Sequence, residues 1–191
     1  MSRVTFAFAL AAIFALAACY PPVTTHPVGT TAGLAPDPAL TGLWKGTNSD
    51  GKPGYFHFLQ QSDGTTVALI VEAGPKAEDW NVATLTTARL GANRVMNATL
   101  QWTNDKPETA PPGTVPVLYR IDARGTLTLA LMDETAVKAA IAAGRIKGTV
   151  GTGEFGDAII TADPKALDAL FASPGAVKLF AEPFFTLRKV E

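Results

Sequence analysis

A two-residue alternation of apolar and polar side chains is the feature that most constrains this fold. Between residues 96 and 102, Met, Ala, Leu and Trp alternate with Asn, Thr and Gln, and the leucines at 127, 129 and 131 alternate with Thr and Ala in the same way. Successive side chains of a β-strand point to opposite faces of a sheet. Both stretches are therefore predicted to be strands with one buried face, and Trp102 is placed on the buried side with Met96.

Short turn sequences join such stretches into hairpins. Each turn is a cluster of small, Gly, Asp or Asn residues of hairpin length. The three clusters are Ser62-Asp63-Gly64, Gly91-Ala92-Asn93 and Ala123-Arg124-Gly125. The runs that they join are residues 55–61 and 65–71, 82–90 and 94–102, and 117–122 and 126–132. Three hairpins in series predict an antiparallel meander.

Two helices interrupt the predicted meander. Asp133 is positioned to cap a helix over residues 134–143, and Asp163 precedes a proline that opens a second helix over 165–172. A final strand over 184–190 follows. Strands dominate and no strand–helix–strand repeat is present. The fold class is therefore predicted to be mostly β, an antiparallel meander closing into a small barrel or sandwich with two short inserted helices.

The N-terminal residues indicate export. Arg3 precedes a largely apolar run over residues 4–18, which ends at Cys19, the only cysteine in the chain. A run of this length is shorter than the ~20 residues needed to cross a bilayer core and fits the apolar region of a secretory signal. Ordinary signal peptidase can cut after Ala15-Leu16-Ala17, so release into the periplasm is one interpretation.

The other interpretation is a lipid anchor. Leu16-Ala17-Ala18-Cys19 resembles the lipobox of bacterial lipoproteins in all four positions. This resemblance implies that residues 1–18 are a signal peptide and that Cys19 carries acyl chains such as palmitate on its sulfur and its amine. It also implies an outer-membrane location, lipid-anchored at the periplasmic face, because residue two of the mature chain is Tyr20 and not the aspartate that retains such proteins at the inner membrane.

The remaining chain divides by composition. Residues 19–39 contain five prolines, several threonines and no apolar period, so they are predicted to form an acylated cysteine plus a tether in which His26 is solvated. Residues 40–191 are predicted to form a single β-rich periplasmic domain.

Charge and thiol content exclude several classes of partner. The mature chain would carry 15 basic and 17 acidic residues, a formal net charge of −2. Such a balance leaves no electrostatic footprint for nucleic acid and no polybasic patch for anionic lipid. Acylation of Cys19 would leave no thiol for a disulfide, so the domain's apolar core is expected to stabilise the fold without one.

Two residues at the ends of the domain carry a second resemblance. Gly42-Leu43-Trp44 opens the first strand and Arg188 lies in the last. This arrangement resembles the lipocalin or broader calycin pattern over residues 42–190, in which the tryptophan closes one barrel end beneath an arginine. A guanidinium over an indole face is worth ~0.5–2 kcal/mol. The Thr-Asp-x-Tyr element typical of lipocalins is missing, so a calycin-like shape without kinship and an ordinary core role for Trp44 both stay open.

The sequence offers little for cofactor, metal or nucleophilic chemistry. Residues 151–156 match a dinucleotide fingerprint as a string, but a strand pattern follows where a helix is needed. His57 would be the single imidazole of the domain, too few for a zinc site. No serine stands in a Gly-x-Ser-x-Gly motif. No cofactor and no metal are expected, and Glu154 with Asp157 is the acid pair that a hydrolase would use.

One long connection is a candidate for partner contact. Residues 103–114 lie between two predicted strands and lack periodicity, a length at which loops are often functional. Its polar residues are Asn104, Asp105, Lys106 and Glu108. A loose surface excursion is the alternative.

Together these observations predict a non-catalytic outer-membrane lipoprotein, an accessory or envelope-organising partner of another envelope protein. The alternatives are a lipocalin-like binder of an apolar small molecule and a carboxylate-dependent hydrolase of cell-wall glycan. A packed barrel interior would favour the first, an open apolar cavity the second, and a cleft with two adjacent acids the third.

Overall fold

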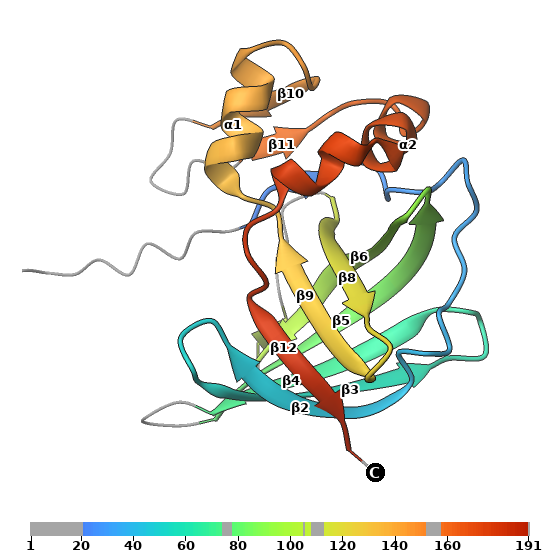
Figure 1. The fold of residues 1–191 in the computed structure, drawn as a ribbon, viewed down its shortest axis with the longest axis vertical. Helices are drawn as coiled ribbons and strands as arrows, with labels where there is room; N and C mark the ends of the chain where they lie inside the picture. The colour runs from blue at the N-terminus through green and yellow to red at the C-terminus, as the bar shows by residue number, and fades with distance from the viewer. Residues whose placement is uncertain (1–20, 74–77, 105, 108–112, 152–157, 191) are drawn as a thin grey trace, which may run out of the picture.

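The computed structural model describes residues 21–73, 78–104, 106–107, 113–151 and 158–190. A closed β-barrel forms one part of the molecule, and a smaller cap of helices and short strands covers one side of it (Figure 1). The signal peptide and the lipobox lie outside the described residues. Within the described ranges, no helix has both the length and the apolar character needed to cross a membrane.

Eight antiparallel strands close the barrel, so the predicted fold class is confirmed. The first seven follow one another as a meander in which each strand pairs with the next. The last strand inserts between the first and the seventh, and this pairing closes the barrel. The strands are β2 (Gly42–Asn48), β3 (Pro53–Gln60), β4 (Thr66–Ala73), β5 (Glu78–Leu90), β6 (Asn93–Thr103), β8 (Val115–Ile121), β9 (Thr126–Leu131) and β12 (Phe185–Lys189).

The three predicted hairpins are present, and local hydrogen bonds fix two of their turns. The Asp63 carboxylate accepts from the Thr65 backbone at 2.9 Å, and the Asp122 carboxylate accepts from the Arg124 and Thr126 backbones at 2.8 Å. These bonds lower the pKa of both carboxyls. The glycines of the same turns, Gly64 and Gly125, have φ of +86° and +74°, a conformation that residues with a Cβ rarely adopt.

Aromatic and aliphatic side chains fill the barrel. The largest of them are fully or almost fully buried, and they are Trp44, Phe56, Phe58, Met96, Leu127, Leu129, Phe185 and Leu187. Gly54 of β3 leaves room for the Phe185 ring, because a Cβ there would lie 2.5 Å from that ring. Phe185 then packs edge-on against Phe56 with ring centroids 4.8 Å apart.

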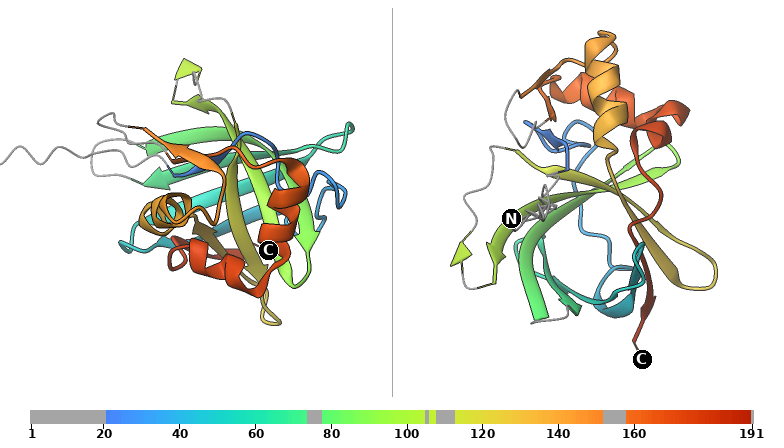
Figure 2. Two further views of the ribbon diagram at one scale, coloured as in Figure 1. Left: turned by 90° about the horizontal axis from the view of Figure 1, so that it is seen from above. Right: turned by 90° about the vertical axis from the view of Figure 1, so that its left-hand side faces the viewer.

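The cap is built from the chain between β9 and β12 together with the N-terminal segment. Its elements are α1 (Glu134–Ala142), α2 (Pro164–Ala172), the 3-10 helix η1 (Pro174–Leu179), and the three-stranded sheet of β1 (Val23–Thr24), β11 (Ala158–Ile160) and β10 (Gly148–Val150). Figure 2 shows these elements gathered on one side of the barrel. A second apolar core, centred on Val137, Leu167 and Phe171, lies between the cap and the barrel wall.

Both helices begin where their capping residues predict. Asp133 accepts from the Ala136 backbone at 2.7 Å, and Asp163 accepts from the Ala166 backbone at 2.9 Å. The helix ends agree with the predicted ones to within one residue. η1 has no counterpart among the sequence predictions.

The predicted tether is wrong for residues 21–39, which are part of the folded domain. β1 pairs in parallel with β11, and Val28 is fully buried. The Asn97 side chain accepts from the Val28 backbone at 2.7 Å and donates to it at 2.9 Å. The Asp168 carboxylate accepts from the backbones of residues 29, 31 and 32.

This docking could not be predicted from the segment's own sequence, because side chains of the barrel and cap make most of the hydrogen bonds that hold it. The segment itself contributes two buried valines, too few for an apolar period. A proline-rich segment also loses less conformational entropy when it is fixed. Low apolar content therefore did not mean that this segment was free.

Candidate functional site

The N-terminal segment closes one mouth of the barrel. We call residues 32–41 the strap. The Ala35 backbone donates to Thr87 at 2.9 Å, and the Thr87 hydroxyl donates back to Ala35. Farther along the strap, Leu40 is buried and its carbonyl accepts from the Trp44 indole at 2.6 Å. Hydrogen bonds thus attach the strap to the rim of the barrel at Ala35 and at Leu40.

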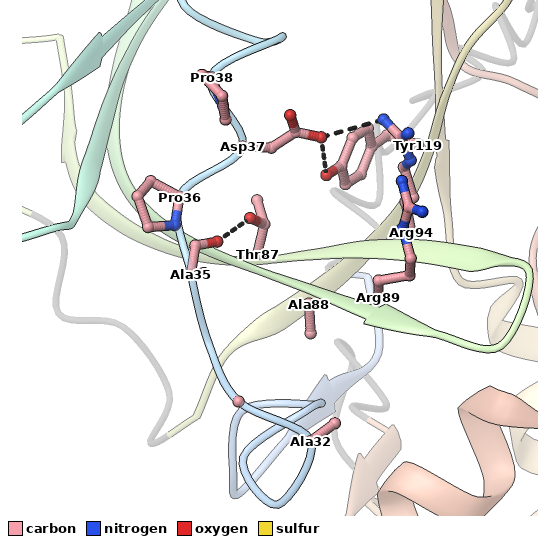
Figure 3. A pocket seen from close by; sticks show the side chains of 11 residues that line it. Ala32, Ala35, Pro36, Asp37, Pro38, Thr87, Ala88, Arg89, Arg94 and Tyr119 are labelled. Atoms are coloured by element: carbon pink, nitrogen blue, oxygen red, sulfur yellow. Dashed lines mark hydrogen bonds and ion pairs between the residues drawn. The ribbon is translucent and has the colours of Figure 1, made fainter.

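Asp37 lies at the centre of this closure (Figure 3). One of its carboxylate oxygens accepts from the Arg94 guanidinium at 3.2 Å and from the Tyr119 hydroxyl at 2.8 Å. The other accepts from the Ala39 backbone at 3.0 Å. Arg94 and Asp37 side chains are 33% and 19% exposed, so this ion pair is partly shielded from water.

Tyr119 is held as a neutral donor. Burial raises the pKa of its hydroxyl, and the hydrogen bond to Asp37 and the charge of that carboxylate raise it further. The phenol therefore stays protonated at physiological pH and donates to Asp37. The Tyr119 hydroxyl thus provides a hydrogen bond to the carboxylate that the strap places in the barrel mouth.

A cavity of about 290 Å³ lies against this cluster. The strap lines one side of it, and β5, β6 and β8 line the other, with Arg89 beside Arg94 (Figure 3). The cavity contains one carboxylate, Asp37, whose two oxygens are already engaged. In the described part of the chain, no group of three or more His, Cys, Asp or Glu residues is arranged to hold a metal ion.

The barrel interior is almost filled. A residual cavity of about 60 Å³ is lined by apolar side chains, among them Phe58, Met96 and Phe184. Pockets that bind small molecules usually measure ~300–1,000 Å³. The interior cavity lined by the described residues is too small for such a ligand.

The predicted closure by Trp44 and Arg188 is half right. Trp44 is 2% exposed and plugs the barrel end, but the cation over its ring is Lys189, whose Nζ lies 5.7 Å from the ring centroid. Arg188 is exposed and points outward beside Lys45. Because strand side chains alternate, Leu187 and Lys189 share the inner face and Arg188 cannot.

The outside of the barrel carries an unusual surface over β2 to β6. Five large apolar side chains there are between 38% and 45% exposed, and they are Leu43, Tyr55, Leu59, Leu69 and Trp102. We call the surface that they share with their strand neighbours the outer apolar face. It consists of Leu43, Tyr55, His57, Leu59, Leu69, Val71, Trp80, Val82 and Trp102.

Trp102 belongs to this face because of a β-bulge. The register of β5 and β6 shifts between Val82 and Ala83, so Trp102 lies opposite Val82 and not inside the barrel. The prediction that Trp102 is buried with Met96 is therefore wrong. The sequence did contain a signal of the face, since residues 67–71 are apolar at every position without alternation.

The candidate partner loop is partly described. Asn104 exchanges hydrogen bonds with the Trp80 backbone, at 2.8 Å and 3.1 Å, and has φ of +52°. Lys106 is exposed in β7 (Lys106–Pro107), which pairs with the end of β6. Asp105 and Glu108 lie outside the described residues, as do the predicted acid pair Glu154 and Asp157. The loop thus begins as an ordered continuation of the sheet.

Comparison with protein-family models, curated proteins and solved structures finds no significant match. The protein belongs by its fold to the class of small, closed antiparallel barrels of calycin-like shape, here with a helical cap. The description of the fold therefore rests on the order and pairing of its strands.

Proposed function

We propose that this protein is a non-catalytic, lipid-anchored protein of the outer membrane that acts through its exterior as an accessory partner of another envelope protein. The observation that carries the proposal is the filled and strapped barrel. With about 60 Å³ of free interior, the fold is suited to present surfaces and not to enclose a ligand.

The barrel counts against the two alternatives. A carrier of an apolar small molecule needs an accessible interior, but the strap, Trp44 and the Asp37 cluster close one mouth. A glycan hydrolase needs two carboxyl groups ~5–9.5 Å apart. The described barrel mouth supplies Asp37 alone, and that carboxylate is bound on both oxygens.

The lipid anchor is supported by the sequence at Cys19 and by the absence of any other cysteine. Each buried methylene contributes ~0.8 kcal/mol, and two or more acyl chains hold a protein stably at a bilayer. Attachment through Cys19 would thus need no help from the domain, which leaves the domain's exterior free for recognition.

Cys19→Ser tests the anchor in cells that process lipoproteins. The parent chain should incorporate labelled palmitate and fractionate with outer membranes, whereas the variant should be unlabelled and either uncleaved or released. Equal membrane retention and labelling of both would contradict the proposal.

Photo-crosslinking from exposed positions of the parent chain tests the partner role. Adducts of one partner should form from neighbouring positions on one surface. A fluorescent apolar probe that binds the purified domain stoichiometrically, with no such adducts, would instead establish a carrier.

A further inference from the structure

The outer apolar face departs from the pattern that is usual for a sheet face in water. Antiparallel sheets with one face in water alternate apolar-in and polar-out. One cross-strand row on the other side of the barrel does so with the outward residues Thr47, Thr186, Thr128 and Arg120. The corresponding row of the outer apolar face is Leu43, His57, Leu69, Val82 and Trp102. Among the described residues of the barrel strands, the exposed large apolar side chains thus lie on β2, β3, β4 and β6, and the other exposed ones, Leu34, Val150 and Val177, lie outside the barrel.

We propose that the outer apolar face lies on the surface of the bilayer into which the acyl chains of Cys19 insert, so that the anchored domain has one fixed orientation. This inference rests on the lipid anchor of the proposed function and adds the surface that meets the membrane.

The length of chain before the domain favours the bilayer as the occupant. Thr24 exchanges two backbone hydrogen bonds of 2.9 Å with Thr114, so the chain is fixed to the domain there. Cys19 comes five residues before Thr24, a reach of at most ~18 Å. A free tether of residues 19–39 would have let the domain turn in any direction, but the docked segment does not.

The point of attachment lies at the same end of the barrel as Trp102. Thr114 directly precedes Val115, which pairs with Ala98 of β6. Trp102 is four residues farther along β6, or ~14 Å at the rise of a strand. The five residues from Cys19 can span that distance, so the acyl chains and Trp102 can reach one plane.

The chemistry of the face suits a bilayer interface. Tyr55, Trp80 and Trp102 combine an apolar ring with a polar group, the combination that is enriched where hydrocarbon meets headgroups. No member of the face carries a carboxylate. Lys45 and Lys52 are exposed near Tyr55, where their amines can reach lipid phosphates.

The three tryptophans of the chain provide a direct test. Trp80 and Trp102 belong to the face, whereas Trp44 is 2% exposed inside the barrel and serves as an internal control. The acylated full chain is inserted into vesicles of phosphatidylethanolamine and phosphatidylglycerol, some of whose acyl chains carry bromine near the headgroup. Bromine quenches tryptophan emission on contact.

We expect brominated vesicles to lower the emission of Trp80 and Trp102 about twofold and to leave Trp44 unchanged. Trp80→Phe and Trp102→Phe, singly and together, assign the signal. Leu69→Asp should reduce the quenching because it places a carboxylate in the middle of the face. Thr128→Asp adds the same charge to the polar side of the barrel and should not.

The outcomes separate the two proposals. A chain that floats with vesicles without quenching of Trp80 or Trp102 is anchored but not oriented by this face, which overturns the inference alone. The inference is also overturned if vesicles cause no quenching and the face is instead covered, in detergent, by a second copy of the chain or by one crosslinked protein. Failure to float with the vesicles contradicts the lipid anchor itself.

Discussion

At the scale of single residues, Asp37 links the strap to the barrel. Asp37→Asn removes the negative charge that Arg94 and Tyr119 share and leaves a partly buried guanidinium without a counter-ion. Hydrogen bonds to charged groups contribute ~1.5–3 kcal/mol, and partial exposure reduces this value. We expect the free energy of unfolding to fall by ~1–2 kcal/mol, measured by urea denaturation. Asp50→Asn, in an exposed turn, should change it by less than ~0.5 kcal/mol.

The raised pKa of Tyr119 predicts how the free energy of unfolding changes with pH in the alkaline range. Its pKa is raised in the folded state, so the unfolded chain loses this proton first as pH rises through ~10. Unfolding is then favoured, and the stability that Tyr119 contributes below pH ~10 is progressively lost above it. We expect Tyr119→Phe to destabilise the protein at pH ~8 and to show a shallower loss between pH ~9 and ~11. Parallel pH profiles for both proteins would contradict this assignment.

Lys189 replaces Arg188 as the residue that covers Trp44. Lys189→Ala should cost ~0.5–1 kcal/mol, and the cost should fall in a Trp44→Phe background because the two side chains are in contact. Arg188→Ala, on the outer face of the same strand, should cost less than ~0.5 kcal/mol in either background. Coupling of Trp44 to Arg188 and not to Lys189 would reverse the assignment. Urea denaturation of the three single and two double variants measures it.

At the scale of elements, the Asp168 carboxylate of α2 binds the N-terminal segment. Its carboxylate accepts from the backbones of Gly29, Thr31 and Ala32 and from the Thr31 hydroxyl, and the residue is 8% exposed. Asp168→Asn keeps the shape but turns half of the acceptor into a donor. We expect a loss of ~2–3 kcal/mol and faster hydrogen exchange of amides 28–33.

The same helix supplies the control for that variant. Asp163→Asn should change stability by no more than a few tenths of a kcal/mol, because asparagine caps a helix as well as aspartate does. If Asp168→Asn is equally mild and exchange over 28–33 is unchanged, the segment does not depend on this carboxylate.

Elements with local signals were predicted from the sequence, and those held by distant partners were not. Gly64, Asp133 and Asp163 mark turns and helix starts through bonds to their own neighbours, so hairpins and helices were found to within a few residues. Docking of the N-terminal segment at residues 28 and 29 depends on Asn97 and Asp168, far away in the chain. The Asp37 cluster was missed for the same reason, since Arg94 and Tyr119 come from two other strands.

At the scale of the whole molecule, the order of elements couples the two cores. The chain leaves the barrel after β9, builds α1, the short strands, α2 and η1, and returns as β12 to close the barrel between β9 and β2. The N-terminal segment crosses from the cap to the barrel mouth as well. We therefore expect closure of the barrel to depend on the cap, which brings β12 back to its place.

This connectivity predicts a single unfolding transition for cap and barrel. Phe171 is fully buried in the cap core and packs edge-on against Phe180, with ring centroids 5.9 Å apart. Phe171→Ala should cost ~3–5 kcal/mol. The loss should be the same whether it is measured by tryptophan emission, which reports the barrel, or by hydrogen exchange of amides in α1 and α2, because β12 depends on the cap. A cap that exchanges freely around an intact barrel would show that the strands close without it, and the two cores would then be independent units.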